Sequence, residues 1–114
     1  MEATELIMLY DYYGDLLTER QRECFELRYN QDLSLGEIGQ ELSISRQGVY
    51  DNLSRTEMQL RNMELKTGCV RRDLQCRKAI GSVYEAASQL VQNDDKQVVA
   101  LAEQILTAIA DLKE

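Results

Sequence analysis

Apolar side chains recur every three or four residues along most of the chain, the spacing that places them on one face of an α-helix. In the first segment, residues 2–13, Leu6, Leu9, Tyr10 and Tyr13 form such a stripe. Proline is absent and only six glycines interrupt the pattern, so little in the sequence punctuates strands or long loops. The pattern therefore predicts an all-α fold.

Two capping boxes mark the next helix starts. Thr18 and Gln21 have the spacing at which each side chain bonds the other residue's backbone N–H, and Ser34 and Glu37 repeat it. The core-facing residues of the first of these helices are Cys24, Phe25 and Leu27. The second helix is expected to end at Leu42 and is framed by a hydrophobic staple between Leu33 and Ile38.

Ser45 is the natural cap of a third helix, joined to the second by a tight turn. Val49, Leu53 and Leu60 lie close to one face of this helix. Two short helices and a tight turn in "SLGEIGQELSISRQGVYDNL" are the plan of a helix-turn-helix. Gly36 and Gly39 interrupt its scaffold helix, and Gly39 is expected to allow close approach of the helix that follows.

The face of the third helix opposite its apolar stripe is a candidate for reading DNA. Its polar residues are Arg46, Gln47, Tyr50, Ser54 and Arg55. Arginine suits guanine edges and glutamine suits adenine edges, while the other residues can reach bases or backbone. Three arginines against two acids leave residues 45–62 at only +1. An ordinary polar helix face is an equal alternative.

Charge limits what the chain can bind. The 114 residues carry a net charge of −7, which opposes unfocused attraction to nucleic acid, so any such site must be a local patch. Residues 61–78 hold six cations against two acids, a sum of +4. Here Arg71, Arg72, Arg77 and Lys78 are candidates for following a phosphate backbone of DNA or RNA. The alternative is a solvated helix face.

The C-terminal part, residues 67–114, predicts a pair of longer helices after a helix-turn-helix domain in residues 1–66. Its first apolar stripe runs from Val70 to Leu90, and "QNDDK" precedes the last segment. That segment is expected to pack against the preceding helix, a second copy of the chain, or both. The candidate oligomerisation residues are Leu101, Ile105, Ile109 and Leu112.

Several chemistries have no residues to support them. Histidine is absent, which removes the usual general base and zinc ligand, and no phosphate-binding loop or calcium loop occurs. The three cysteines form no C-x-x-C pair and fit free thiols in a reducing compartment. We expect a cytoplasmic protein that is not an enzyme and needs no metal or other cofactor, with no membrane segment.

The run "LLTERQRECFELRYNQDLSLGEIGQELSISRQGVYDNLSRTEMQL" resembles region 4 of bacterial sigma factors and, more closely, the YlxM family of small helix-turn-helix proteins. This resemblance covers about half the chain. It implies a sigma region 4-like helix-turn-helix bundle in a bacterial protein whose gene neighbours that of the signal recognition particle GTPase. It also implies a role in the signal recognition particle pathway, as a regulator.

Two functions follow from these observations. The first is a regulator that binds DNA as a homodimer through two third helices. The second is an accessory protein that does not bind DNA and contacts the signal recognition particle GTPase or its small RNA. The helix-turn-helix alone does not choose between them, because one fold serves many functions.

Overall fold

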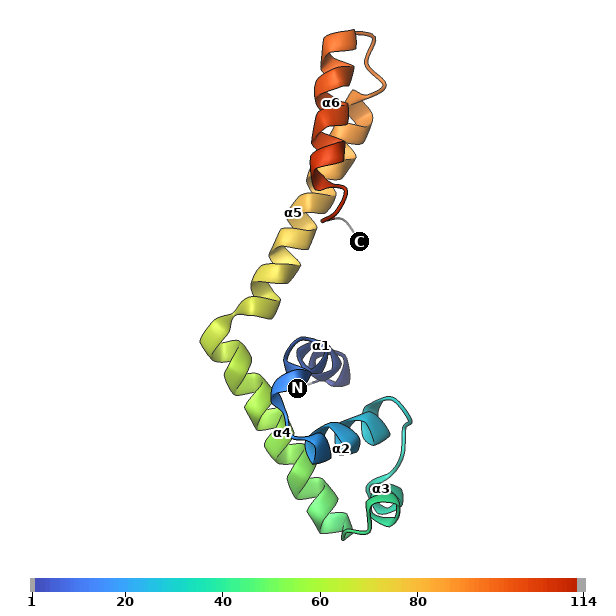
Figure 1. Ribbon diagram of the computed structural model, residues 1–114, viewed down its shortest axis with the longest axis vertical. Coiled ribbons are helices and arrows are strands. Elements are labelled where there is room, and N and C mark those ends of the chain that lie inside the picture. The colour runs from blue at the N-terminus through green and yellow to red at the C-terminus, as the bar shows by residue number, and fades with distance from the viewer. Residues whose placement is uncertain (1, 113–114) are drawn as a thin grey trace. The chain divides into compact units, whose positions relative to one another are not determined.

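Figure 1 shows the computed structural model of the chain, which describes residues 2–112. Throughout that range the regular structure is helical, which confirms the predicted all-α fold. In chain order the elements are α1 (Ala3–Tyr13), the short 3-10 helix η1 (Gly14–Leu16), α2 (Glu19–Tyr29), α3 (Leu35–Leu42), α4 (Arg46–Thr67), α5 (Cys69–Leu90) and α6 (Lys96–Ile109). No helix among the described residues is both long and apolar enough to cross a membrane.

The chain forms two compact units, Met1–Val70 and Arg71–Glu114. In the first unit, α1, α2 and α3 all pack against α4, the long helix to their left in Figure 1. One core cluster joins α1 and α2 to the second half of α4, and its buried members include Leu6, Phe25 and Leu60. The predicted α1 stripe is buried at Leu6, Leu9 and Tyr13.

The three predicted caps are present. The hydroxyl of Thr18 accepts from the Gln21 N–H while the Gln21 side chain accepts from the Thr18 N–H, and Ser34 and Glu37 repeat the exchange. Ser45 caps α4 by accepting from the Gly48 N–H. These bonds satisfy backbone donors that a helix start leaves open, so the sequence itself fixes where α2, α3 and α4 begin.

A polar cluster fixes the end of α4. The buried Tyr13 hydroxyl donates to Glu64 Oε1 over 2.6 Å and lies 2.5 Å from Thr67 Oγ1. The same Glu64 oxygen accepts from the Val70 N–H at 3.0 Å, just past Gly68, whose φ of 62° ends the helix. One carboxylate therefore ties α1 to the turn that ends α4.

The second unit contains the rest of α5 and the whole of α6, joined by the turn at residues 91–95. Asp95 caps α6 by accepting from the Gln97 N–H. Figure 1 shows α6 running back along the C-terminal half of α5. Ala87 on α5 and Ala102 on α6 are 1% and 0% exposed, respectively, and both lie on the sides of the helices that face each other.

Candidate nucleic-acid interface

The helix-turn-helix consists of α3, a three-residue turn and the start of α4. Ile38 of α3 and Val49 of α4 are both completely buried, together with Cys24 of α2. Because these three side chains share one cluster, they hold the first turns of α4 at a fixed angle to α3. The first turns of α4 are thus a rigid support for any side chain that points outward.

The turn itself depends on two unusual backbone positions. Ser43 has a φ of 58° and ψ of 42°, a left-handed conformation that ends α3. A Cβ placed on Gly39 would lie 2.7 Å from the carbonyl oxygen of Ile44. This confirms the expectation that Gly39 allows close approach, and it shows that the chain entering α4 passes directly over that glycine.

Most of the predicted DNA-reading residues lie on the outer surface of α4. Arg46, Gln47, Tyr50 and Arg55 are exposed, whereas Ser54 is half-buried. Tyr50 is 55% exposed, which is high for so large a ring and leaves it available for contact. The first three belong to the first two turns of α4, which is the part of a recognition helix that contacts bases.

Local contacts and a nearby carboxylate limit what this surface can bind. The Gln47 side-chain amide donates to Asp51 Oδ1 at 3.0 Å, so it has to leave that carboxylate to contact a base. At the start of α3, hydrogen bonds from the backbone N–H and hydroxyl of Ser34 lower the pKa of Glu37. That carboxylate is charged at neutral pH and disfavours a phosphate at this helix start.

Two arginines near the motif were not predicted as site residues. The Arg28 guanidinium donates to the Leu33 carbonyl at 3.0 Å, and the Arg20 guanidinium donates to the Leu42 carbonyl at 3.3 Å. Both side chains are exposed on α2 and brace the two ends of α3. Sequence gave no signal for the Arg20 contact, because its partner is 22 residues away.

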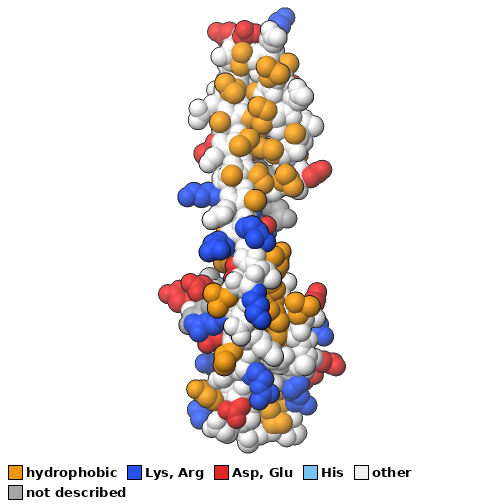
Figure 2. All heavy atoms as spheres, turned by 90° about the vertical axis from the view of Figure 1, so that its left-hand side faces the viewer, with side chains coloured by type: hydrophobic (Ala, Val, Ile, Leu, Met, Phe, Trp, Pro, Cys, Tyr) orange, Lys and Arg blue, Asp and Glu red, His pale blue; other side chains and the backbone are white. Residues whose placement is uncertain are grey.

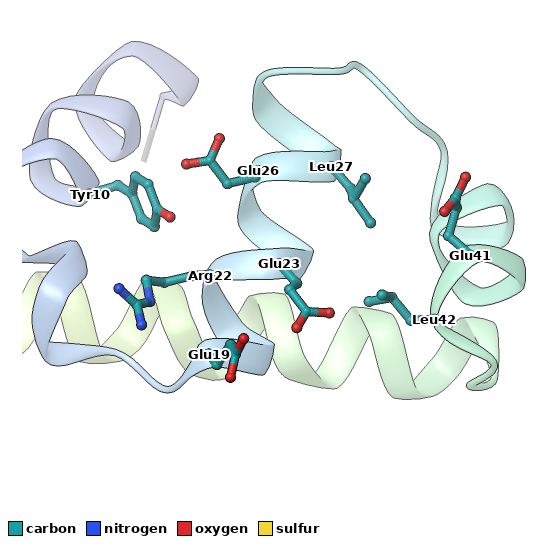
Figure 3. Close-up of a pocket in the computed structure, with 8 residues that line it drawn as sticks. All are labelled: Tyr10, Glu19, Arg22, Glu23, Glu26, Leu27, Glu41 and Leu42. Carbon is teal, nitrogen blue, oxygen red and sulfur yellow. The ribbon is translucent and has the colours of Figure 1, made fainter.

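An acidic hollow lies between α1, α2 and α3 (Figure 3). It has a volume of about 600 Å³. Its lining consists of one arginine, Arg22, three apolar or aromatic residues, Tyr10, Leu27 and Leu42, and four glutamates, Glu19, Glu23, Glu26 and Glu41. Burial, followed by a hydrogen bond to Glu26, raises the pKa of Tyr10 to about 12. Four carboxylates against one guanidinium repel phosphate, so this hollow is no part of a nucleic-acid interface.

The predicted basic junction is divided between the two units. Arg61 and Lys66 belong to the first unit, and the other four cations lie on α5 in the second. Arg71, Arg72, Arg77 and Lys78 are all exposed, and Arg77 forms a 3.2 Å ion pair with Asp73. Arg71 and Lys78 lie on the same side of α5, about 10 Å apart along its axis.

The four predicted oligomerisation residues do not share one environment. Leu101, Ile105 and Leu112 are 56%, 38% and 59% exposed, respectively. Ile109 is half-buried and lies on the side of α6 that faces α5. Within the second unit, three of the four are therefore available to a partner.

The chain is similar to a group of small bacterial proteins. Residues 1–105 match the family UPF0122, described as "Putative helix-turn-helix protein, YlxM / p13 like". A UPF0122 protein of Thermoanaerobacter sp. strain X514 is 40% identical over 108 residues, which cover 94% of this chain and 92% of the relative. A UPF0122 protein of Bacillus cereus strain AH187 is 37% identical over 106 residues, covering 91% and 96%. One from Acetivibrio thermocellus is 54% identical over 71 residues, covering 62% and 61%.

Proposed function

The chain belongs to the UPF0122 family of YlxM/p13-like helix-turn-helix proteins, and on that basis we propose that it is a regulatory protein that binds DNA through the start of α4. The observation that carries the proposal is the exposure of Arg46, Gln47 and Tyr50 above the buried contact between Ile38 and Val49. Side chains that reach out from a rigid support lose little freedom when they bind, which favours specific recognition.

Charge makes specific contacts more important here than in a strongly basic protein. Each phosphate that a cation neutralises steepens the dependence of log affinity on log salt by about 0.9. Arg46 and Arg55 are the exposed cations of the proposed reading surface, so we expect a shallow slope of about −2 for each copy. Sequence-specific contacts to base edges then have to supply most of the discrimination.

The test begins with selection of binding sequences from a pool of random double-stranded DNA. The selected duplex is then titrated with the wild-type chain and with Arg46→Ala. Loss of one good arginine contact to a base costs about 1–3 kcal/mol, so we expect binding to weaken about 5- to 150-fold.

The matched control is Arg22→Ala, which removes the same charge from the acidic hollow. It should change affinity by less than about threefold, because it lies off the proposed surface. Failure to enrich any sequence would show that the proposal is wrong. Equal weakening by the two variants would show that net charge, rather than the α4 surface, governs binding.

The basic run of α5 supports a second candidate, an accessory role in the signal recognition particle pathway through the particle's small RNA. Arg71 and Lys78 are exposed on one side of α5, a spacing that suits successive contacts along a phosphate backbone. Titration of that RNA with Arg71→Glu/Lys78→Glu tests it, with Arg46→Ala as the control. Loss of RNA binding in the α5 variant alone would favour the accessory role over DNA reading.

A further inference from the structure

The hairpin formed by α5 and α6 leaves most of its large apolar side chains uncovered. Among residues 71–112, only Ala87 and Ala102 are fully buried. On α5, Val83 and Leu90 are 43% and 44% exposed, and on α6 Leu101 is 56% exposed. Two helices whose only fully buried side chains are two alanines bury little apolar surface between them, which is a weak basis for a unit that is stable alone.

The exposed and covered apolar residues form separate seams. On α5 the covered seam contains Ile80 and Ala87, with Val91 following the end of the helix, and on α6 it contains Val98, Ala102, Leu106 and Ile109. A second seam on each helix is exposed at every position and repeats at intervals of three and four residues. On α5 its members are Cys76, Ala79, Val83, Ala86 and Leu90, and on α6 they are Leu101, Ile105 and Ala108, with Leu112 following the end of the helix.

The two exposed seams lie on the same face of the hairpin. Successive residues of a helix are about 100° apart around its axis, so the exposed seam of each helix lies about 80° around the axis from its covered seam. Viewed from the start of each helix, the rotation has the same direction in α5 and α6. Because α5 and α6 run in opposite directions, the same rotation brings both seams to one side. Figure 2 shows hydrophobic side chains over the side of this unit that is turned toward the viewer. We call the surface that the two exposed seams form the outer face.

The outer face carries no charged residue at any of its nine positions. Its length on each helix is about 20 Å and its width is that of two helices, so its flat area is roughly 400 Å². A patch of this size is comparable with the largest apolar patch on a typical soluble monomer, and such patches are often interaction sites. A spacing of three and four residues is also the repeat with which helices pack into bundles.

We propose that the outer face is a homodimer interface, at which the hairpins of two copies pack face to face as a four-helix bundle. Each helix then has two seams, one against its own hairpin partner and one against the other copy, which is the arrangement inside such bundles. The inference rests on the α5–α6 hairpin alone and does not depend on DNA binding.

A second copy fits this face better than a charged partner. The chain has a net charge of −7, so most ways of bringing two copies together place like charges in contact. The outer face limits that repulsion because no charged residue lies within its two seams, and the nearest charge in line with the α5 seam is Arg72, about one turn before Cys76. Two such faces add up to roughly 800 Å² of flat area, and the relief of the side chains raises the area that they bury toward the roughly 1,200 Å² of the smallest specific interfaces.

The oligomeric state of the full chain tests the proposal. Light scattering with size-exclusion chromatography at up to about 100 µM should give twice the monomer mass of 13.1 kDa. Leu101→Glu/Ile105→Glu puts two carboxylates of each copy on the outer face. We expect it to weaken association more than 100-fold and to give the monomer mass.

The matched control is Ala100→Glu/Thr107→Glu, which adds the same charges to exposed positions on the opposite side of α6. It should remain dimeric. A monomeric wild-type chain, a dimeric outer-face variant, or equal dissociation of the two variants would each overturn the proposal.

Helical content by circular dichroism shows whether the outer-face variant still folds. If it loses helix, the milder Ile105→Ala replaces it, because truncation adds no charge and alanine favours helix. We expect this variant to weaken association at least tenfold with helical content retained. An unchanged dissociation constant would then count against the interface.

Discussion

Replacing Gly39 with alanine should destabilise the first unit, although alanine normally stabilises a helix. The added Cβ would lie 2.7 Å from the carbonyl oxygen of Ile44, and the atoms behind it, Ser45 C and Arg46 N, belong to the same backbone segment. A backbone cannot rotate away as a flexible side chain can. The start of α4 therefore has to shift, and overpacking of this kind costs about 1–3 kcal/mol.

Gly36 provides the matched control, since it lies in the same helix. A Cβ there would find Ser34 Oγ at 4.0 Å as its nearest neighbour, so alanine fits. Gly36→Ala should raise the free energy of unfolding by about 0.5–1 kcal/mol through helix propensity alone. The same gain partly offsets the clash in Gly39→Ala, which leaves a net loss of up to about 2 kcal/mol.

Thermal unfolding followed by the tyrosine signals in near-ultraviolet circular dichroism measures this difference. Five of the six tyrosines belong to the first unit, so the signal reports mainly on that unit. For a unit of this size, 1 kcal/mol corresponds to about 4–8 °C in Tm. We expect Gly36→Ala to melt higher and Gly39→Ala to melt lower than the wild type. If Gly39→Ala were as stabilising as Gly36→Ala, the close approach would not exist.

Three further changes test other parts of the first unit. Tyr13→Phe removes the hydrogen bond to the Glu64 carboxylate and should cost about 1–3 kcal/mol in chemical unfolding, and an unchanged midpoint would contradict that bond. Ser43→Gly relieves a left-handed conformation and should stabilise by up to about 1 kcal/mol, whereas a loss would show that the serine side chain is needed. The pKa of Tyr10 is raised from 10.0 to about 12, so the unfolded chain ionises first and stability should fall as the pH rises between these values. Tyr10→Phe should reduce that fall, and an identical alkaline profile would contradict the assignment.

The sequence was informative where structure depends on neighbours in the chain. The pairs Thr18 with Gln21 and Ser34 with Glu37 are three residues apart, so their capping bonds follow from spacing alone. The close approach at Gly39 was also predictable, because a glycine inside a short helix needs a reason. Local rules of this kind fixed α2, α3 and the start of α4.

Contacts between distant parts of the chain were not predictable in the same way. Val70 was assigned to the apolar stripe of the C-terminal helices, yet it is buried in the core of the first unit with Leu6 and Leu60. Likewise, the stripe from Val70 to Leu90 is not a single face. Val83 is exposed and Ala87 is buried, and this difference can be explained only when it is known that α6 covers one side of α5.

An acidic chain can carry a helix-turn-helix that binds DNA if its acidic residues lie away from the binding surface. Residues 1–70 hold seven cations and thirteen acids, but four of those acids line the hollow between α1, α2 and α3. On the exposed side of the first half of α4 there are two cations, Arg46 and Arg55, and one acid, Asp51. A weakly positive surface on an acidic protein suppresses unspecific attachment to polyphosphate while leaving specific contacts intact. The affinity of such a protein for DNA increases most when two copies bind together, because the second contact then forms within the same complex. The uncharged outer face of α5 and α6 would supply that second copy without adding positive charge.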